Sequence, residues 1–254
     1  MRVAVAGGTG MTGRHVVQAL AARGHDPVVV ARSRGADLLT GRGLDAALES
    51  VDVVIDVSNV TTVGRRRSEA FFGTAGRNLL AAGEKAGVRH HVALSIVGID
   101  RVALGYYQGK LLQEKLVRTG PVPWTVLRAT QFHEFALQLL DRTRGPVAVV
   151  PPMATQPVAV REVAEALVDL AEGEPGGMAP QLAGPRVENM ADLTRRLLHA
   201  RGSRRLVLSP RLPGAVFAAM ADGGLLPTEP GDRGGQTWDE WLEEHVHETG
   251  RAGS

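Results

Sequence analysis

The chain has 254 residues, 44% of them hydrophobic, and carries a net charge of +2. This length suffices for one large α/β domain, or for a nucleotide-binding domain with a small appended lobe. The absence of cysteine excludes a disulfide framework, a thiolate nucleophile and a cysteine metal site. The small net charge, the lack of a long apolar run and the lack of a signal peptide predict a cytoplasmic protein that binds neither nucleic acid nor membranes.

Short apolar runs alternate with helical patterns along the first part of the chain. The runs predict strands at Val3–Ala6, Pro27–Val30, Asp37–Leu39, Asp52–Val57, His91–Ser95, Trp124–Leu127 and Val147–Val150. The helical patterns cover Met11–Arg23, Ser68–Ala86 and Tyr107–Thr119. Apolar strands that alternate with helices indicate a parallel sheet covered on both faces. We therefore predict a doubly wound, Rossmann-type α/β domain over residues 1–150.

The pattern becomes less regular beyond Pro151. Helices are expected near Val160–Ala171 and Val187–Ala200, and connections rich in glycine and proline separate them. We interpret residues 151–254 as a small C-terminal substrate-binding or lid region packed on the same domain.

The most informative segment is Gly7-Gly8-Thr9-Gly10-Met11-Thr12-Gly13, between the first strand and the first helix. Glycine at three of these positions lets the backbone approach a ligand, and lets the helix and strand pack closely. The helix N-terminus then presents free N–H groups to a phosphate. The segment predicts a dinucleotide pyrophosphate site, with a simple tight turn as the alternative.

The residues after the second strand bear on which dinucleotide is bound. An acidic residue there would bind the ribose hydroxyls and select NAD, but the chain continues Ala31-Arg32-Ser33-Arg34. Arg32 can pair with a ribose 2′-phosphate. We therefore predict NADP(H), and the alternative is an exposed arginine in a loop.

A tyrosine, a lysine and a serine suggest a reaction. Tyr106 and Lys110 stand four residues apart, so both face one side of a helical turn, and Ser95 ends the preceding strand. Reduction of a carbonyl by hydride needs a proton donor, and a phenol can serve if a nearby ammonium lowers its pKa. A serine hydroxyl can orient the carbonyl. The same spacing also occurs on ordinary surface helices.

The glycine loop, the Ser95 strand end and the Tyr-x-x-x-Lys pair resemble the short-chain dehydrogenase/reductase superfamily. The opening loop and Leu127-Arg128-Ala129-Thr130-Gln131-Phe132 are similar to its atypical, NmrA-like NAD(P)-binding branch, over residues 1 to about 165. The resemblance implies that Tyr106 is the acid/base, that Lys110 lowers its pKa and holds the nicotinamide ribose, and that Ser95 fixes the substrate oxygen. The expected cofactor-binding residues are Gly7, Thr9, Gly10, Met11, Thr12, Gly13, Arg32, Ser33, Asp56, Val57, Ser58, Lys110, Ala129 and Thr130.

Gln131 and His133 should stand at the mouth of the sheet, where they could contact substrate. No metal site is predicted. We expect an NADPH-dependent reductase that transfers hydride to a small carbonyl or quinone substrate. A non-catalytic NADP(H)-binding redox sensor is the alternative. A sugar-nucleotide epimerase or dehydratase is disfavoured because the C-terminal part is short for a nucleotide-sugar lobe. The oligomeric state is open, with a homodimer among the options.

Overall fold

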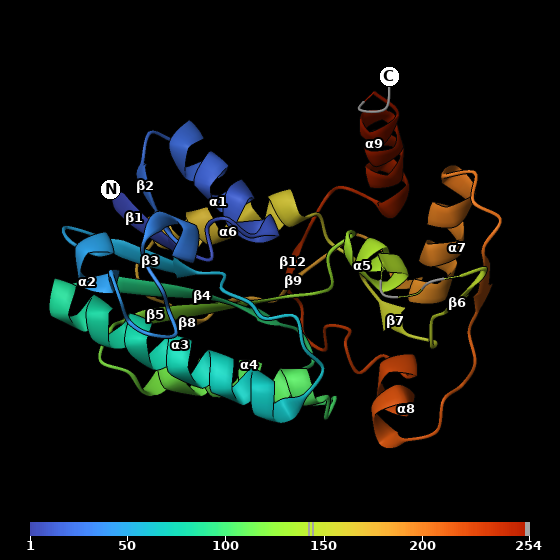
Figure 1. The fold of residues 1–254 in the computed structure, drawn as a ribbon, viewed down its shortest axis with the longest axis horizontal. Helices are drawn as coiled ribbons and strands as arrows, with labels where there is room; N and C mark the ends of the chain where they lie inside the picture. Colours follow the sequence, from blue (N-terminus) through green and yellow to red (C-terminus); the bar gives the residue numbers. More distant parts are fainter. Residues whose placement is uncertain (142, 144, 252–254) are drawn as a thin grey trace. The chain divides into compact units, whose positions relative to one another are not determined.

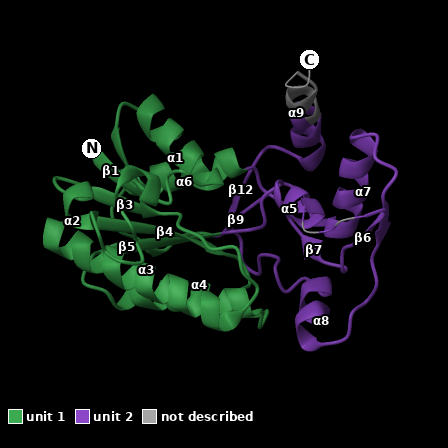
Figure 2. Cartoon of the chain, in the orientation of Figure 1, with its two compact units in different colours: residues 1–128, 160–180 green, residues 129–159, 181–254 purple. Residues whose placement is uncertain are grey.

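The computed structural model describes residues 1–141, 143 and 145–251, with side chains up to residue 245 in the last helix (Figure 1). The chain separates into two compact units (Figure 2). Unit 1 comprises Met1–Arg128 and Val160–Pro180, and unit 2 comprises Ala129–Ala159 and Gln181–Ser254. The chain therefore returns to unit 1 after residue 159, whereas the substrate-binding role expected for residues 151–254 stays a prediction.

Unit 1 contains a parallel sheet. Its strands are β1 (Arg2–Ala6), β2 (Asp26–Val30), β3 (Val53–Asp56), β4 (His90–Ile96), β5 (Trp124–Ala129) and the short β8 (Gly177–Met178). Their order is β5-β4-β3-β1-β2, with β8 paired to β5. The pairs β1–β2, β1–β3, β3–β4 and β5–β8 are all parallel. The chain thus reverses its direction of winding between β1 and β3, the place where such sheets bind ligands.

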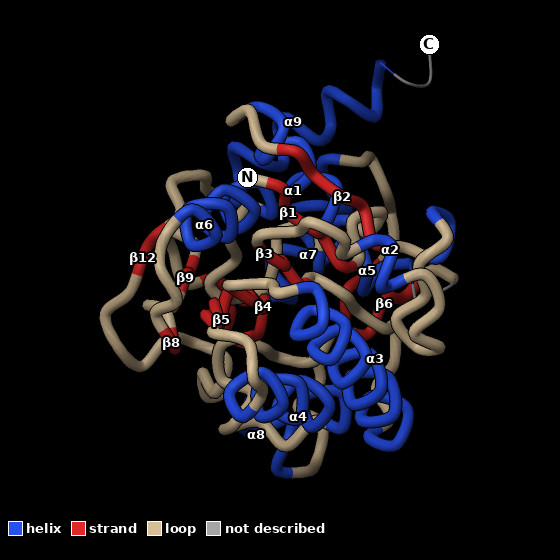
Figure 3. Tube along the Cα trace, turned by 90° about the vertical axis from the view of Figure 1, so that its left-hand side faces the viewer, coloured by secondary structure: helices blue, strands red, loops and turns tan. Residues whose placement is uncertain are grey.

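Helices cover both faces of this sheet. They are α1 (Met11–Ala22), the 3₁₀-helix η1 (Arg32–Arg34), α2 (Leu44–Ala47), α3 (Arg65–Ala86), α4 (Gly105–Thr119) and α6 (Val160–Glu172). Figures 1 and 3 show α1 and α6 on one face and α3 and α4 on the other. The predicted doubly wound, Rossmann-type fold is therefore confirmed.

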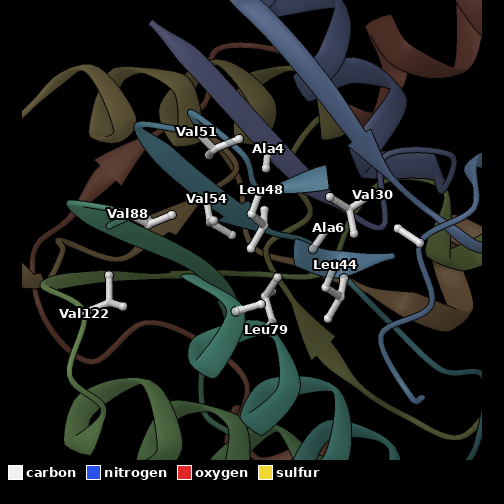
Figure 4. Packing of buried hydrophobic residues seen from close by; sticks show 12 residues of the cluster. Ala4, Ala6, Val30, Leu44, Leu48, Val51, Val54, Leu79, Val88 and Val122 are labelled. Atoms are coloured by element: carbon white, nitrogen blue, oxygen red, sulfur yellow. The ribbon is translucent and has the colours of Figure 1, made fainter. Parts of the chain in front are cut away.

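Apolar side chains fill the space between the sheet and its helices. Figure 4 shows one cluster, in which Ala4 and Ala6 of β1 and Val54 of β3 face Leu44 of α2 and Leu79 of α3. All five are nearly inaccessible to solvent. Both faces of β1 are buried, and this explains why the sequence of this strand is a continuous apolar run.

Helix α6 closes the opposite face by packing on α1. Arg23, at the end of α1, binds Glu165, Asp169 and Glu172 of α6 at 2.5, 2.5 and 3.0 Å. A segment from late in the sequence thus completes the layer that α1 begins.

The strand expected at Asp37–Leu39 is not formed. The segment is a turn, in which the Asp37 N–H binds the Arg42 carbonyl. Gly41 and Gly43 both take a positive φ, and a Cβ at residue 43 would lie 2.2 Å from the Gly35 carbonyl. Leu39 is exposed and does not extend the sheet. The edge strand on this side is β2, which stands last in the strand order.

Unit 2 is built from short elements. They are α5 (Phe135–Asp141), β6 (Val147–Val149), β7 (Ala154–Thr155), β9 (Leu182–Ala183), β10 (Glu188–Asn189), α7 (Met190–Ala200), β11 (Leu206–Leu208), α8 (Ala215–Ala221), β12 (Asp232–Arg233) and α9 (Trp238–Arg251). Ala129 and β12 pair with β9, and β7 pairs with β10. The strand predicted at Val147–Val150 was wrongly assigned to the central sheet, because β6 pairs with β11 in a separate two-stranded sheet. In the described part of the chain, no helix is both long and apolar enough to span a membrane.

Buried polar side chains fix α4 against the sheet. Glu114 of α4 accepts two hydrogen bonds from the Arg128 guanidinium of β5, both at 2.8 Å, and Asp100 accepts a third at 2.9 Å. The side chains of Glu114 and Arg128 are only 5% and 13% exposed. The geometry is bidentate, which is the strong form of this pairing.

We expect Glu114→Ala to destabilise the fold by about 3 kcal/mol, because it leaves a largely buried guanidinium without its main partner. Urea unfolding measures the change. Glu69→Ala is the matched control, because Glu69 pairs with Arg65 on the surface of α3 and such pairs contribute less than about 1 kcal/mol. Equal losses in the two variants would contradict the importance of the buried pair.

Candidate functional site

The glycine loop is a cradle that side chains would fill. Gly7 has φ +82°, and a Cβ there would lie 2.9 Å from Ser58 Cα. A Cβ at Gly13 would lie 2.2 Å from the Gly7 carbonyl oxygen. The Gly10 N–H closes the loop onto that same oxygen at 2.8 Å. Glycine is therefore required at these positions by close backbone approach.

The loop leads directly into α1, and Gly10, the N-cap residue before this helix, provides no side-chain cap. Thr9 and Gly10 are exposed, whereas Thr12 is buried beneath them. An uncapped helix start beside a glycine cradle is suited to a pyrophosphate. Arg14, which the sequence reasoning missed, donates from Nη1 to the Thr9 carbonyl at 3.1 Å and adds positive charge at this loop.

Arg32 and Ser33 lie next to this loop in the fold. The Gly7 N–H binds the carbonyl of Val30, the last residue of β2, and η1 follows two residues later. Both Arg32 and Ser33 are exposed. An exposed guanidinium beyond the end of β2 is compatible with a 2′-phosphate contact, which stays a prediction.

The end of β3 forms the second wall of the cradle. Asp56 is buried, and its Oδ1 accepts the Ser58 N–H at 2.9 Å. Ser58 is also buried, yet its Oγ has no hydrogen-bond partner among the described residues. An unpartnered buried hydroxyl beside Gly7 fits the polar part of a bound dinucleotide.

Lys110 lies in a buried hydrogen-bonded chain. Its Nζ donates to the Leu94 carbonyl at 2.6 Å and to Gln113 Oε1 at 2.5 Å. Gln113 Nε2 in turn donates to Asp56 Oδ2 at 2.7 Å. The ammonium also lies 4.9 Å from the centre of the Phe72 ring. Burial lowers the pKa of Lys110 to about 8, against the opposing effects of nearby carboxylates.

Tyr106 is not part of the hydrogen-bonded series that links Lys110, Gln113 and Asp56. Its hydroxyl donates to Asn59 Oδ1 at 2.8 Å, and Asn59 follows β3 in the loop toward α3. Burial raises the pKa of Tyr106 to about 12. The Lys110 ammonium binds Leu94 and Gln113 here, and a lowering of the Tyr106 pKa by Lys110 stays a prediction.

Ser95 lies near the end of β4, where the resemblance placed the residue that binds the substrate oxygen. It is 2% exposed, and its Oγ has no partner among the described residues. A buried hydroxyl without a partner is costly, and a ligand oxygen would satisfy it.

Unit 2 contains a second group of the predicted residues. Thr130 Oγ1 donates to the Gln156 carbonyl at 2.6 Å, and Gln131 Oε1 accepts from Thr155 Oγ1 at 2.9 Å. Gln131 Nε2 is buried without a described partner. The His133 ring stacks on Trp241 of α9, with 5.6 Å between ring centroids. His133 is thus held by packing within unit 2.

Sequence reasoning missed Arg14, Asn59, Gln113 and Thr155. Gln113 and Lys110 are three residues apart on α4, a spacing that places both on the inner face, so this partner could have been found. Asn59 and Thr155 stand in a loop and a two-residue strand, where no periodicity marks them.

The fold and the cradle together define a Rossmann-type dinucleotide-binding protein. Residues 7–174, more than half of the chain, match the family model described as NAD(P)H-binding, and the chain belongs to this family. This match confirms the resemblance as far as an NAD(P)H-binding family with a Rossmann-type fold.

Known proteins share this fold at low sequence identity. Triphenylmethane reductase of Citrobacter sp. superposes with a TM-score of 0.76 and 17% identity, over 98% of this chain and 100% of the other. The Escherichia coli NADPH-dependent quinone oxidoreductase QOR2, solved with NADPH, gives 0.73 and 19%, over 96% and 99%. These likenesses show the fold alone.

One curated relative carries the name of an assembly factor. The photosystem II assembly factor Ycf39 of Synechocystis sp. is 29% identical over 161 residues. The match covers 56% of this chain and 49% of the relative, so the chain spans about half the length of the relative that it matches.

We expect stability to increase between pH 8 and pH 10.5, by on the order of 3 kcal/mol, through Lys110. The folded chain releases this proton near pH 8, whereas the unfolded chain keeps it until about pH 10.5. The unfolded state therefore binds more protons in this window, and the free energy of unfolding rises with pH. Urea unfolding of the wild type and of Lys110→Met tests this: the difference between their pH slopes should vanish outside the window. Parallel curves throughout would contradict it.

Proposed function

We propose that this protein is an NADPH-dependent reductase that transfers hydride to a carbonyl or quinone substrate. The observation that supports it most is the pair of unpartnered buried hydroxyls, on Ser58 and Ser95, at the ends of β3 and β4 in an NAD(P)H-binding unit. These strands lie beside β1 and its glycine loop. A dinucleotide and a substrate oxygen would supply the missing partners.

The proposed cofactor residues follow from the cradle. Residues 7–13 would hold the pyrophosphate, Arg32 and Ser33 the 2′-phosphate, and Asp56, Val57 and Ser58 the middle of the dinucleotide. Ala129 and Thr130 would line it at the end of β5. When bound, the reduced cofactor supplies the hydride.

Tyr106 is the proposed proton donor. Since its pKa is raised to about 12, the phenol is protonated at neutral pH and can donate to an oxygen that gains negative charge as hydride arrives. Ser95 Oγ would donate a hydrogen bond to the same oxygen. The carbonyl carbon gains the hydride, its oxygen gains the proton, and the phenolate recovers a proton from water.

Lys110 has a different role in this proposal. Its ammonium is tied through Gln113 to Asp56, which in turn holds the Ser58 N–H beside Gly7. Lys110 would thus stabilise the cofactor-facing end of β3. The ammonium has three N–H groups, and the third could donate to the nicotinamide ribose while the bonds to Leu94 and Gln113 are kept.

A second candidate is an NADP(H)-binding protein without turnover. The relation to an assembly factor favours it, since that relative is named for assembly and for no reaction. Such a protein would keep the cradle and would not need the Tyr106 hydroxyl.

Tyr106→Phe should lower the rate of NADPH consumption with quinones and ketones by about 100-fold or more, because it removes the general acid. Tyr107→Phe is the control, since it removes the other hydroxyl on the same turn and leaves the ring. Steady-state NADPH oxidation measures both. Tight NADPH binding without turnover by the wild type would favour the second candidate. Full activity in Tyr106→Phe would mean hydride transfer without this donor.

Arg32→Ala should weaken NADPH binding by about tenfold or more and leave NADH binding unchanged, because only NADPH carries the 2′-phosphate. Calorimetric titration with both cofactors measures this. Arg118→Ala, an exposed arginine in the last turn of α4, controls for the loss of charge. Equal losses for the two cofactors would remove Arg32 from the phosphate site.

A further inference from the structure

The backbone of Tyr106 is fixed where the first turns of α3 and α4 meet. A Cβ at Gly105 would lie 2.7 Å from Arg65 N, and a Cβ at Gly109 would lie 2.6 Å from the Ser68 carbonyl carbon. Ser68 is fully buried and donates its hydroxyl proton to the Tyr106 carbonyl at 2.7 Å. The two helices are therefore in direct backbone contact on both sides of Tyr106.

The ring of Tyr106 is also held. Its centroid lies 5.9 Å from that of Phe72 and 5.7 Å from that of Tyr107. These are distances at which aromatic rings attract each other. With backbone and ring held, the direction of the hydroxyl proton is what remains to be set.

Asn59 sets that direction. Its Oδ1 accepts the Tyr106 hydroxyl at 2.8 Å and also the Val60 N–H at 2.7 Å. Because a backbone N–H can only donate, the second bond identifies this amide atom as the oxygen. The phenol therefore meets an acceptor, and its single proton is directed to Asn59.

We propose that Asn59 is a positioning residue that keeps the Tyr106 hydroxyl aimed until a substrate oxygen replaces the amide as acceptor. This inference rests on the proposed function. In the step itself, the Tyr106 O–H bond breaks and a substrate O–H bond forms as hydride reaches the carbonyl carbon. The hydrogen bonds of Asn59 Oδ1 go to Tyr106 and to Val60 of its own loop, so its proposed effect on the substrate is exerted through the tyrosine.

A kinetic double-mutant cycle tests the catalytic part. Asn59→Ala should lower kcat for NADPH oxidation by a soluble naphthoquinone about tenfold, with the KM for NADPH unchanged, because one hydrogen bond is lost. In the Tyr106→Phe background the same substitution should have no further effect. Thr62→Ala is the matched control, because Thr62 lies in the same loop and binds only the Gly64 N–H. An equal loss in both backgrounds, or a loss confined to cofactor binding, would overturn the inference.

Fluorine NMR gives a readout that needs no turnover. The chain has two tyrosines, so Tyr107→Phe protein labelled with fluorotyrosine has one resonance, from Tyr106. Asn59→Ala should shift this resonance, whereas Thr62→Ala should not. An unchanged resonance would overturn the inference whatever the activity. If the resonance shifts but the wild type never consumes NADPH, the contact stands, and it is the proposed function, with the catalytic role of Asn59, that fails.

Discussion

The architecture of unit 1, which carries the glycine loop, depends on the polar contacts that hold the inner face of α4 against three neighbouring strands. Lys110 binds the Leu94 carbonyl of β4, Gln113 binds Asp56 of β3, and Glu114 binds Arg128 of β5. Each side chain is buried, so a helix shifted by one turn would leave several polar groups without partners. These polar contacts therefore help to fix the register of α4 on the sheet, together with its close approach to α3. Tyr106 stands one turn before Lys110, and its place follows from this register.

Much of this could be predicted from local sequence. The glycine loop, the parallel strands and the helices each have a pattern that depends only on neighbours, and glycine at positions 7 and 13 is required by contacts within one strand-loop-helix unit and its adjacent strand. Ser95 and Asp56 were placed correctly at strand ends because a parallel sheet brings those ends to one edge.

What the local patterns did not reveal is which groups bind one another. Tyr106 and Lys110 share a helical face, yet the Lys110 ammonium binds the Leu94 carbonyl and Gln113 Oε1. Val147–Val150 is as apolar as a central strand, yet it pairs with β11, some sixty residues later. Strand propensity indicates that a segment can form a strand, but it does not identify the strand with which that segment pairs.

The return of the chain to unit 1 also has a consequence for synthesis. The layer that begins with α1 is completed by α6, whose carboxylates meet Arg23. A nascent chain that ends near residue 150 lacks α6, so Arg23 has none of these three carboxylates to bind. Unit 1 is complete only when residues 160–180 have left the ribosome, and these follow residues 129–159 of unit 2. Its folding is thus tied to translation of the segment between its two pieces.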